Sequence, residues 1–204
     1  MPLATDTRDV YDGLAALYLP VAVAVFVVIV VALAWVVVRG RAGGPDEHRG
    51  LEVAYATVLA VVAAVLIVAT FRAVDRENAR AAGPAEVIRV VAGKWDWRFE
   101  YPRHGIVETS SAAGAPAMLT VPAGEDVEFF ATSVDVVHGF WIPDLRFQRQ
   151  LIPGQSATFR LTFPRPGFTT SGTCSFFCGL EHARMHFLVD VLSPADYDAW
   201  ARGR

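Results

Sequence analysis

The sequence predicts a hairpin of two membrane-spanning helices followed by an all-β barrel with Greek-key connections. Residues 14–38 and 53–71 are two long runs without a charged side chain. A run of that length crosses a hydrocarbon core of about 30 Å as a helix. After these runs, the chain changes to short stretches of β-forming residues that are separated by turns rich in proline and glycine,.

Length and composition limit the classes of function. The chain has 204 residues, of which 53% are hydrophobic, and its formal net charge is −3. This length leaves room for one compact domain besides the membrane segments. No basic cluster accompanies the slightly acidic charge, so we expect no nucleic-acid partner. The first apolar run is not expected to be a cleaved signal peptide, because the residues before it are mostly acidic and the run is too long.

The charge of the connector between the two runs predicts their orientation. It carries Arg39, Arg41 and Arg49, whereas the N-terminal tail is mostly acidic. By the positive-inside rule, the connector lies in the cytoplasm. Both termini and the β domain are then expected outside a bacterial or archaeal plasma membrane, with the lipid bilayer around the two helices.

The chain is expected to have three parts. Residues 1–74 form the tail and the two spans, residues 75–84 form a polar, alanine-rich linker, and residues 85–204 form the extracytoplasmic domain. Eight short strands favour a β-sandwich or a Greek-key barrel. They are expected at residues 86–92, 95–101, 117–121, 126–132, 136–141, 147–152, 157–163 and 186–192.

A short helix is predicted after the last strand. Ser193 is suited to the N-cap position, and Pro194 is suited to the first helical position,. We expect this helix to end near Trp200 and to close the barrel by packing.

The residues that indicate chemistry are concentrated between positions 174 and 185. This stretch contains both cysteines of the chain, Cys174 and Cys178, followed by His182 and Met185, and His138 lies upstream. Thiolates, imidazoles and a thioether form a soft donor set that suits copper. A tetrahedral zinc site has no use for the methionine.

Three simpler interpretations apply to the same residues. Two cysteines in an oxidising compartment can form a structural disulfide. Two cysteines and two histidines can hold a structural zinc ion, although zinc ligands usually occur in tighter pairs. Met185 can be a core residue. The combined pattern favours copper because it is far more specific than any of its members.

The motif Cys-x-x-x-Cys-Gly-x-x-His-x-x-Met, with the upstream run His-Gly-Phe-Trp, resembles the CuA-binding motif of subunit II of the haem-copper oxidases. The similarity extends from the first apolar run to about Leu192. That family has a cupredoxin fold and holds two copper ions. The resemblance implies Cys174 and Cys178 as bridging thiolates, His138 and His182 as terminal imidazoles, Met185 as a weak thioether ligand and Phe176 as a main-chain carbonyl ligand.

One position departs from the better-known members of the family. They carry glutamate where this chain has Phe176, and the glutamate side chain reaches a magnesium site shared with the catalytic subunit. Phenylalanine does not ligate magnesium, so the resemblance does not extend to that link. The copper motif is closer to the B-type oxidases and to copper-bearing nitric oxide reductases.

The resemblance implies that the chain is the electron-entry subunit of a respiratory oxidase. The two copper ions accept electrons from cytochrome c and pass them to haem in subunit I, where O2 is reduced to water and protons are translocated. This chain then has no haem of its own, and further membrane subunits are expected. Two alternatives remain: the copper subunit of a nitric oxide reductase, and a free-standing membrane-anchored copper electron carrier. The second span argues against the carrier, because one span suffices for an anchor.

Trp95 and Glu52 are two further candidates. Alternation in residues 94–101 predicts a strand with Trp95 on its aromatic face, which favours packing, whereas the resemblance implies that Trp95 receives electrons from the donor. Glu52 stands at the start of the second span, where a carboxylate complements the helix dipole. Its position is also similar to that of the glutamate at the family's proton entry. Two roles are therefore open for Glu52, stabilisation of the helix dipole and proton entry.

Overall fold

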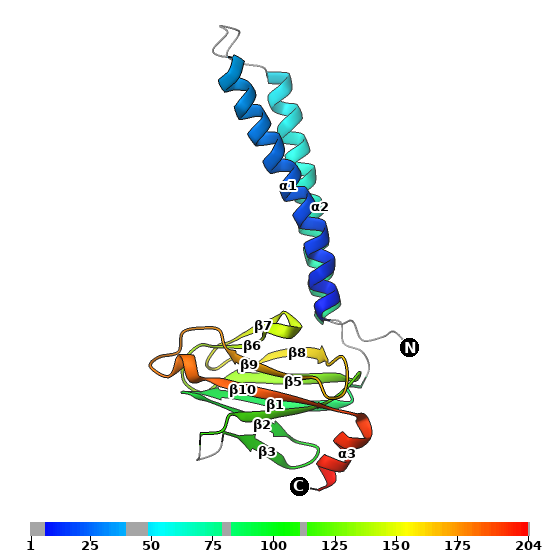
Figure 1. Cartoon of the computed structure of the whole chain (residues 1–204), viewed down its shortest axis with the longest axis vertical. Helices are drawn as coiled ribbons and strands as arrows, with labels where there is room; N and C mark the ends of the chain where they lie inside the picture. The colour runs from blue at the N-terminus through cyan, green and yellow to red at the C-terminus, as the bar shows by residue number, and fades with distance from the viewer. Residues whose placement is uncertain (1–6, 40–48, 79–82, 111–113, 204) are drawn as a thin grey trace. The chain divides into compact units, whose positions relative to one another are not determined.

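The computed structural model describes residues 7–39, 49–78, 83–110 and 114–203. They form two compact units, a helical unit within residues 10–76 and a β domain in the chain that follows. Figure 1 shows the elements of both units.

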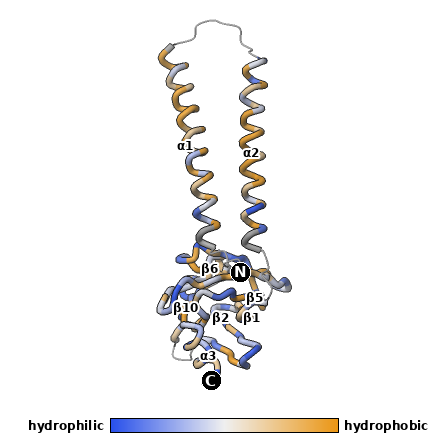
Figure 2. The backbone as a smooth tube through the Cα atoms, turned by 90° about the vertical axis from the view of Figure 1, so that its right-hand side faces the viewer, coloured by the Kyte–Doolittle hydropathy of each residue, from blue (hydrophilic) through white to orange (hydrophobic). Residues whose placement is uncertain are grey.

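The helical unit contains the two expected spans. Helix α1 runs through Thr7–Arg39 and helix α2 through Arg49–Asn78. Both are long and apolar enough to cross a membrane, and Figure 2 shows their hydrophobic character along most of their length. The Tyr18 hydroxyl donates to the carbonyl oxygen of Leu66 at 2.9 Å and lies 2.5 Å from the Thr70 hydroxyl. These contacts join the two helices of the hairpin.

The β domain consists of two five-stranded sheets that pack face to face (Figure 1). In one sheet the strand order is β3-β2-β1-β5-β8, and in the other it is β4-β10-β9-β6-β7. The bounds are β1 Glu86–Gly93, β2 Asp96–Tyr101, β3 Ile106–Thr109, β4 Ala117–Pro122, β5 Asp126–Ser133, β6 His138–Ile142, β7 Phe147–Leu151, β8 Ala157–Thr162, β9 Thr169–Cys174 and β10 His186–Leu192.

Two strand pairs join segments far apart in the sequence. Strand β1 pairs in parallel with β5, and β4 pairs in parallel with β10, whereas the other pairs are antiparallel. Parallel neighbours require crossover connections, so the chain passes repeatedly between the sheets. The expected fold class, two apolar helices followed by a cupredoxin-like β domain, is confirmed.

Aromatic side chains fill the space between the sheets. Trp97, Phe99 and Tyr101 of β2 alternate with more exposed residues and are fully buried. Phe140 and Phe187 stack at 5.0 Å between ring centroids, and Trp97 and Phe187 pack in a T-shaped arrangement at 5.3 Å. Full burial of each such side chain contributes about 1.5–3 kcal/mol. This core supports the strands that carry the candidate ligands.

The structure contains two strands that the sequence pattern does not predict, β3 and β9. Strand β3 has only four residues, and it pairs with β2 at the sheet edge. Strand β9, with the sequence TTSGTC, has no apolar alternation. It nevertheless lies inside its sheet between β6 and β10, because both neighbours supply backbone partners.

The last helix agrees with the sequence prediction. Helix α3 spans Pro194–Arg202, and the Ser193 hydroxyl accepts a hydrogen bond from the Asp196 backbone N–H at 3.1 Å. Tyr197 of this helix is buried, and the Trp200 and Tyr101 rings pack in a T-shaped arrangement at 5.1 Å between centroids. The expected packing role is therefore confirmed.

Candidate metal centre

The candidate donors come from two connections at one end of the β domain. His138 is the first residue of β6, and Cys174 is the last residue of β9. These strands are antiparallel neighbours, with Phe140 opposite Cys174. The Ser175 backbone N–H extends the pairing by donating to the Gly139 carbonyl at 3.1 Å. The sheet therefore brings His138 beside the cysteine motif.

The connection between β9 and β10 folds back on itself. At its base, the Cys174 backbone N–H donates to the Met185 carbonyl at 2.9 Å. A short 3-10 helix, η2, spans His182–Arg184 and points His182 toward Cys178. Five of the six candidate donors, all except His138, thus lie on this one connection.

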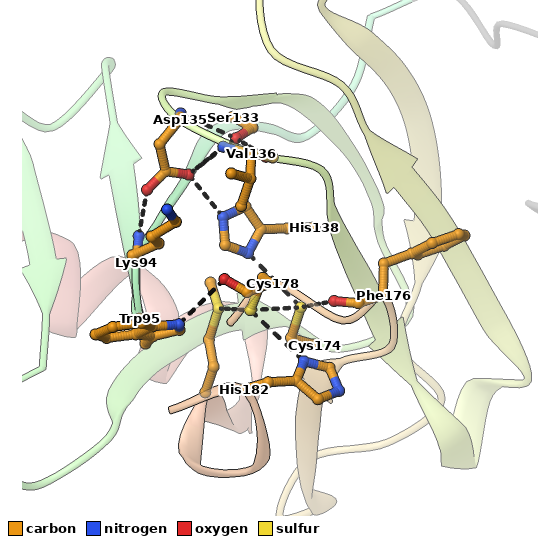
Figure 3. Close-up of polar contacts among 11 residues, drawn as sticks. Lys94, Trp95, Ser133, Asp135, Val136, His138, Cys174, Phe176, Cys178 and His182 are labelled. Atoms are coloured by element: carbon orange, nitrogen blue, oxygen red, sulfur yellow. Dashed lines mark hydrogen bonds and ion pairs between the residues drawn. The ribbon is translucent and has the colours of Figure 1, made fainter. Parts of the chain in front are cut away.

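The donor atoms form a continuous chain of contacts (Figure 3). The sulfur atoms of Cys174 and Cys178 lie 3.8 Å apart and are not bonded to each other. His138 Nδ1 lies 3.6 Å from the Cys174 sulfur, and His182 Nδ1 lies 3.5 Å from the Cys178 sulfur. The Met185 sulfur is 3.7 Å from the Cys178 sulfur. The ligand atoms of His138, Cys174 and Cys178 all lie within 4.8 Å of one another.

The main chain supplies an oxygen donor to the same cluster. The Phe176 carbonyl oxygen lies 3.2 Å from the Cys174 sulfur. This is the carbonyl that the family resemblance implies, and it needs no particular side chain. The structure therefore brings together all six of the sequence-predicted donors.

Most of this cluster is buried, whereas His182 is half-buried. His138 and Met185 are fully buried, and each cysteine is only 4% exposed. Burial, with the neighbouring Cys174 thiol, raises the pKa of the Cys178 thiol to about 12. A metal ion that binds here must therefore displace a firmly held proton.

Asp135 is a residue of this site that the sequence pattern does not single out as functional. Its carboxylate lies 2.8 Å from His138 Nε2 and accepts from the Lys94 backbone N–H at 2.7 Å. Partial burial raises the pKa of Asp135, but hydrogen bonds from His138, Val136 and Lys94 outweigh burial and hold this pKa below its ordinary value. The only sequence signal is an acidic residue three positions before the histidine.

Trp95 lies against the cluster of donor residues, just before β2 begins. Its indole N–H donates to the Cys178 carbonyl at 3.2 Å. A Cβ on Gly179 would lie 3.3 Å from the indole, so the loop passes close over the ring. Trp95 is half-buried, unlike the fully buried aromatic residues that follow it on β2.

Glu52 does not belong to this cluster of residues. It lies in the first turn of α2, in the helical unit, and its side chain is exposed. The helical start is where a carboxylate favours the helix dipole.

The donor set fits copper. Two thiols, two imidazole Nδ1 atoms and a thioether are soft or intermediate ligands, and together they favour copper over hard cations. A tetrahedral zinc site uses four ligands, whereas six donors converge here. The spacing and burial of the cluster are therefore consistent with a buried copper centre.

Comparison with known proteins identifies the family. The protein-family model described as "Cytochrome C oxidase subunit II, periplasmic domain" matches residues 86–192. Cytochrome c oxidase subunit 2 of Alkalihalophilus pseudofirmus is 27% identical over 214 residues, covering 99% of this chain and 60% of that protein. The Bacillus subtilis protein of the same name is 31% identical over 150 residues, covering 71% of this chain and 40% of that protein. The chain thus spans less than two thirds of the length of these relatives.

A solved structure has the same fold as the β domain. The periplasmic domain of subunit II of cytochrome oxidase from Bradyrhizobium japonicum matches with a TM-score of 0.54 and 21% identity, covering 61% of this chain and 96% of that chain. The family implies a copper centre, and it implies a membrane protein with an extracytoplasmic domain. Since the family model covers the β domain from its first strand to its last, the chain belongs to the cytochrome c oxidase subunit II family.

Proposed function

We propose that this chain is the electron-entry subunit of a haem-copper respiratory oxidase. The observation that carries the proposal is the convergence of two thiols, two imidazoles, a thioether and a carbonyl in one largely buried cluster. The oxidase reduces O2 to water with electrons from cytochrome c and couples this reaction to proton translocation. No haem and no oxygen site are assigned to this chain.

The chain would hold two copper ions as a dinuclear CuA centre. Cys174 and Cys178 would hold the copper ions through their thiolates, and His138 and His182 would hold them through the Nδ1 atoms that face the two sulfurs. Met185 would be the weak ligand and Phe176 the carbonyl ligand. When bound, the copper pair supplies one-electron transfer. The β-sandwich holds the donors in place and shields most of them from water, which limits rearrangement between redox states.

The proposed setting assigns a role to each part of the chain. Residues 1–74 would anchor the subunit in the lipid bilayer, and residues 75–84 would link this anchor to the domain at 85–204. Both termini and the copper domain would lie outside the plasma membrane. The partners would be the haem-bearing subunit I, further membrane subunits, and cytochrome c as donor. A magnesium link through position 176 is not part of the proposal.

We assign electron entry to Trp95. Its indole is half-buried and donates to the Cys178 carbonyl at 3.2 Å, so it connects the domain surface with a ligand residue. Trp95→Ala should slow reduction by cytochrome c while the copper absorption spectrum stays unchanged, and Trp95→Phe should restore part of the rate. Collapse of the spectrum in Trp95→Ala would mean that Trp95 is a packing residue.

A second assignment concerns proton entry at Glu52. Its exposed carboxylate at the start of α2 would collect protons for subunit I,. Glu52→Gln should slow oxidase turnover without changing electron entry to the copper, and external weak acids should partly restore turnover. Full turnover of Glu52→Gln would leave only the dipole role, which is worth about 0.3–1 kcal/mol.

Copper loading tests the main proposal. The purified full-length chain, refolded with copper in detergent, should bind two copper ions and show purple thiolate-to-copper absorption. Cys174→Ser and Cys178→Ser should each abolish the colour. One equivalent of colourless zinc, or a Cys174–Cys178 disulfide in the metal-loaded protein, would contradict the assignment.

A further inference from the structure

The carboxylate of Asp135 lies between the first histidine and the turn that carries Trp95. Asp135 belongs to the connection between β5 and β6. Its Oδ1 lies 2.8 Å from His138 Nε2 and accepts from the Val136 backbone N–H at 2.6 Å. Its Oδ2 accepts from the Lys94 backbone N–H at 2.7 Å. Figure 3 shows the two oxygens facing these two directions.

The contact at Oδ1 selects one tautomer of His138. An ionised carboxylate only accepts hydrogen bonds, so Nε2 must carry the proton. In the neutral ring, Nδ1 then has a free lone pair, and this atom lies 3.6 Å from the Cys174 sulfur. A carboxylate behind a metal-binding histidine fixes both the tautomer and the ring orientation. His138 is fully buried, so bulk water does not reach its ring.

The contact at Oδ2 fixes a different part of the domain. Lys94 immediately precedes Trp95 in the turn between β1 and β2. The Val134 backbone N–H adds a bond to the Ala92 carbonyl at 3.0 Å, so the loop is joined to the end of β1 at two points. The Trp95 indole reaches the Cys178 carbonyl from the same turn.

We infer that Asp135 is a positioning residue. Its carboxylate orients the His138 imidazole for metal binding and also fixes the position of the turn that carries Trp95. The inference rests on the proposed copper function, which it deepens. In the part of the chain that the structure describes, Asp135 forms no hydrogen bond with the donor sulfurs or with the Trp95 indole. It acts through His138 on one side and through Lys94 on the other.

The carboxylate has two acceptor oxygens, and asparagine has one. In Asp135→Asn the amide oxygen serves either His138 Nε2 or the Lys94 N–H, and the NH2 group then faces the other donor. The substitution preserves shape and removes the acceptor contacts of one of the two oxygens, either those with His138 and Val136 or that with Lys94. It therefore separates positioning from general packing.

The first experiment uses the metal-free, full-length protein in detergent, with 15N-labelled histidine and amide groups. In the wild-type protein, His138 should be the Nε2–H tautomer at a pH where its ring is neutral. In Asp135→Asn, either the His138 ring signals or the Lys94 amide signal should shift. A wild-type His138 with its proton on Nδ1 would overturn the inference, even where the variant fails to fold.

The second experiment measures copper. Asp135→Asn should lower copper affinity by about 10–100-fold, as expected for the partner of a ligating histidine. It should also alter the hyperfine coupling of the histidine nitrogens in the electron paramagnetic resonance spectrum of the bound copper. Asp198→Asn is the matched control, because Asp198 is exposed on α3 and carries the same charge. Its copper affinity should equal that of the wild type.

The outcomes distinguish this inference from the proposed function. If the wild type binds two copper ions and Asp135→Asn binds them equally tightly with an unchanged spectrum, the positioning role is wrong and the copper function stands. If the wild type binds no copper, the copper function fails, and the tautomer and amide signals of the metal-free protein still decide what Asp135 does.

Discussion

Gly139 illustrates, at the scale of single residues, how tightly the ligand loop packs against the strand that begins with His138. A Cβ at position 139 would lie 2.1 Å from the Ser175 hydroxyl and 2.5 Å from the Phe176 ring. Both neighbours lie between the two cysteines. Only glycine permits this close approach, because any larger residue would push the loop away from β6.

Gly139→Ala should therefore impair stability and metal binding together. Overpacking of this kind costs about 1–3 kcal/mol of the free energy of unfolding, and displacement of the loop should also weaken copper binding. Chemical denaturation and copper titration measure the two effects. Gly50→Ala is the control, because nothing beyond the neighbouring backbone of its own helix lies within 4 Å of the added carbon. Unchanged copper affinity in Gly139→Ala would show that the loop moves without disturbing its donors.

Met185 combines a core position with a donor atom. It is fully buried, and its sulfur lies 3.7 Å from that of Cys178. Met185→Leu conserves volume and should cost less than about 1.5 kcal/mol of stability. Since a weak thioether ligand tunes a copper site more than it holds the metal, both copper ions should stay bound while the reduction potential changes. Redox titration checks this, and an unchanged potential would mean that the sulfur only packs.

At the scale of elements, helix α3 depends on its N-cap. The Ser193 hydroxyl accepts from the Asp196 N–H and donates to the Asp196 carboxylate at 2.6 Å. The helix it starts covers the far end of the core, with Tyr197 buried and donating to the Glu86 carboxylate at 3.0 Å. Loss of the cap should therefore destabilise the β-sandwich as well as the helix.

Ser193→Ala should lower the free energy of unfolding by about 0.5–2 kcal/mol. Urea denaturation of the metal-free protein measures the change. Ser156→Ala, at an exposed serine between β7 and β8, should change it by less than about 0.5 kcal/mol,. Equal values for the two variants would mean that solvent replaces the cap at no cost.

At the scale of the whole molecule, burial of weak acids makes the β domain sensitive to alkali. Burial raises the pKa of Tyr101 and of Tyr197 above the ordinary value for tyrosine, and it raises that of Cys178 to about 12. These groups hold their protons more firmly in the folded chain than in the unfolded chain. Their contribution to stability is therefore complete below the unfolded pKa values, about 8.5 for cysteine and 10 for tyrosine, and is lost as the pH rises through the folded values.

The melting temperature of the metal-free protein should accordingly be constant near pH 7–8 and fall steadily above about pH 8.5, with a steeper fall above about pH 10. Tyr101→Phe should remove part of the steeper fall, although it also loses the hydrogen bonds of the Tyr101 hydroxyl with the Thr120 backbone. A melting temperature independent of pH up to 11 would contradict the prediction.

The sequence by itself determined the features that depend on local patterns. Charge-free runs long enough for a bilayer predict the two helices, and period-two alternation predicts strands such as β10, His186–Leu192, at their observed bounds. The spacing of Cys174, Cys178, His182 and Met185 predicts a single ligand loop, because these residues are close in the chain. The Ser193 cap follows from a preference that acts over one turn.

Only the tertiary structure decided what depends on distant segments. Strand β9 is polar, and its place between β6 and β10 follows from backbone partners that no local pattern encodes. The same pairing brings His138 to the cysteine loop, and a separate loop contact brings the Asp135 carboxylate between His138 and Lys94. Non-local strand pairing and burial produce these contacts. Their physical origin is the shared core between two sheets, where each strand gains its stability from neighbours far away in the chain.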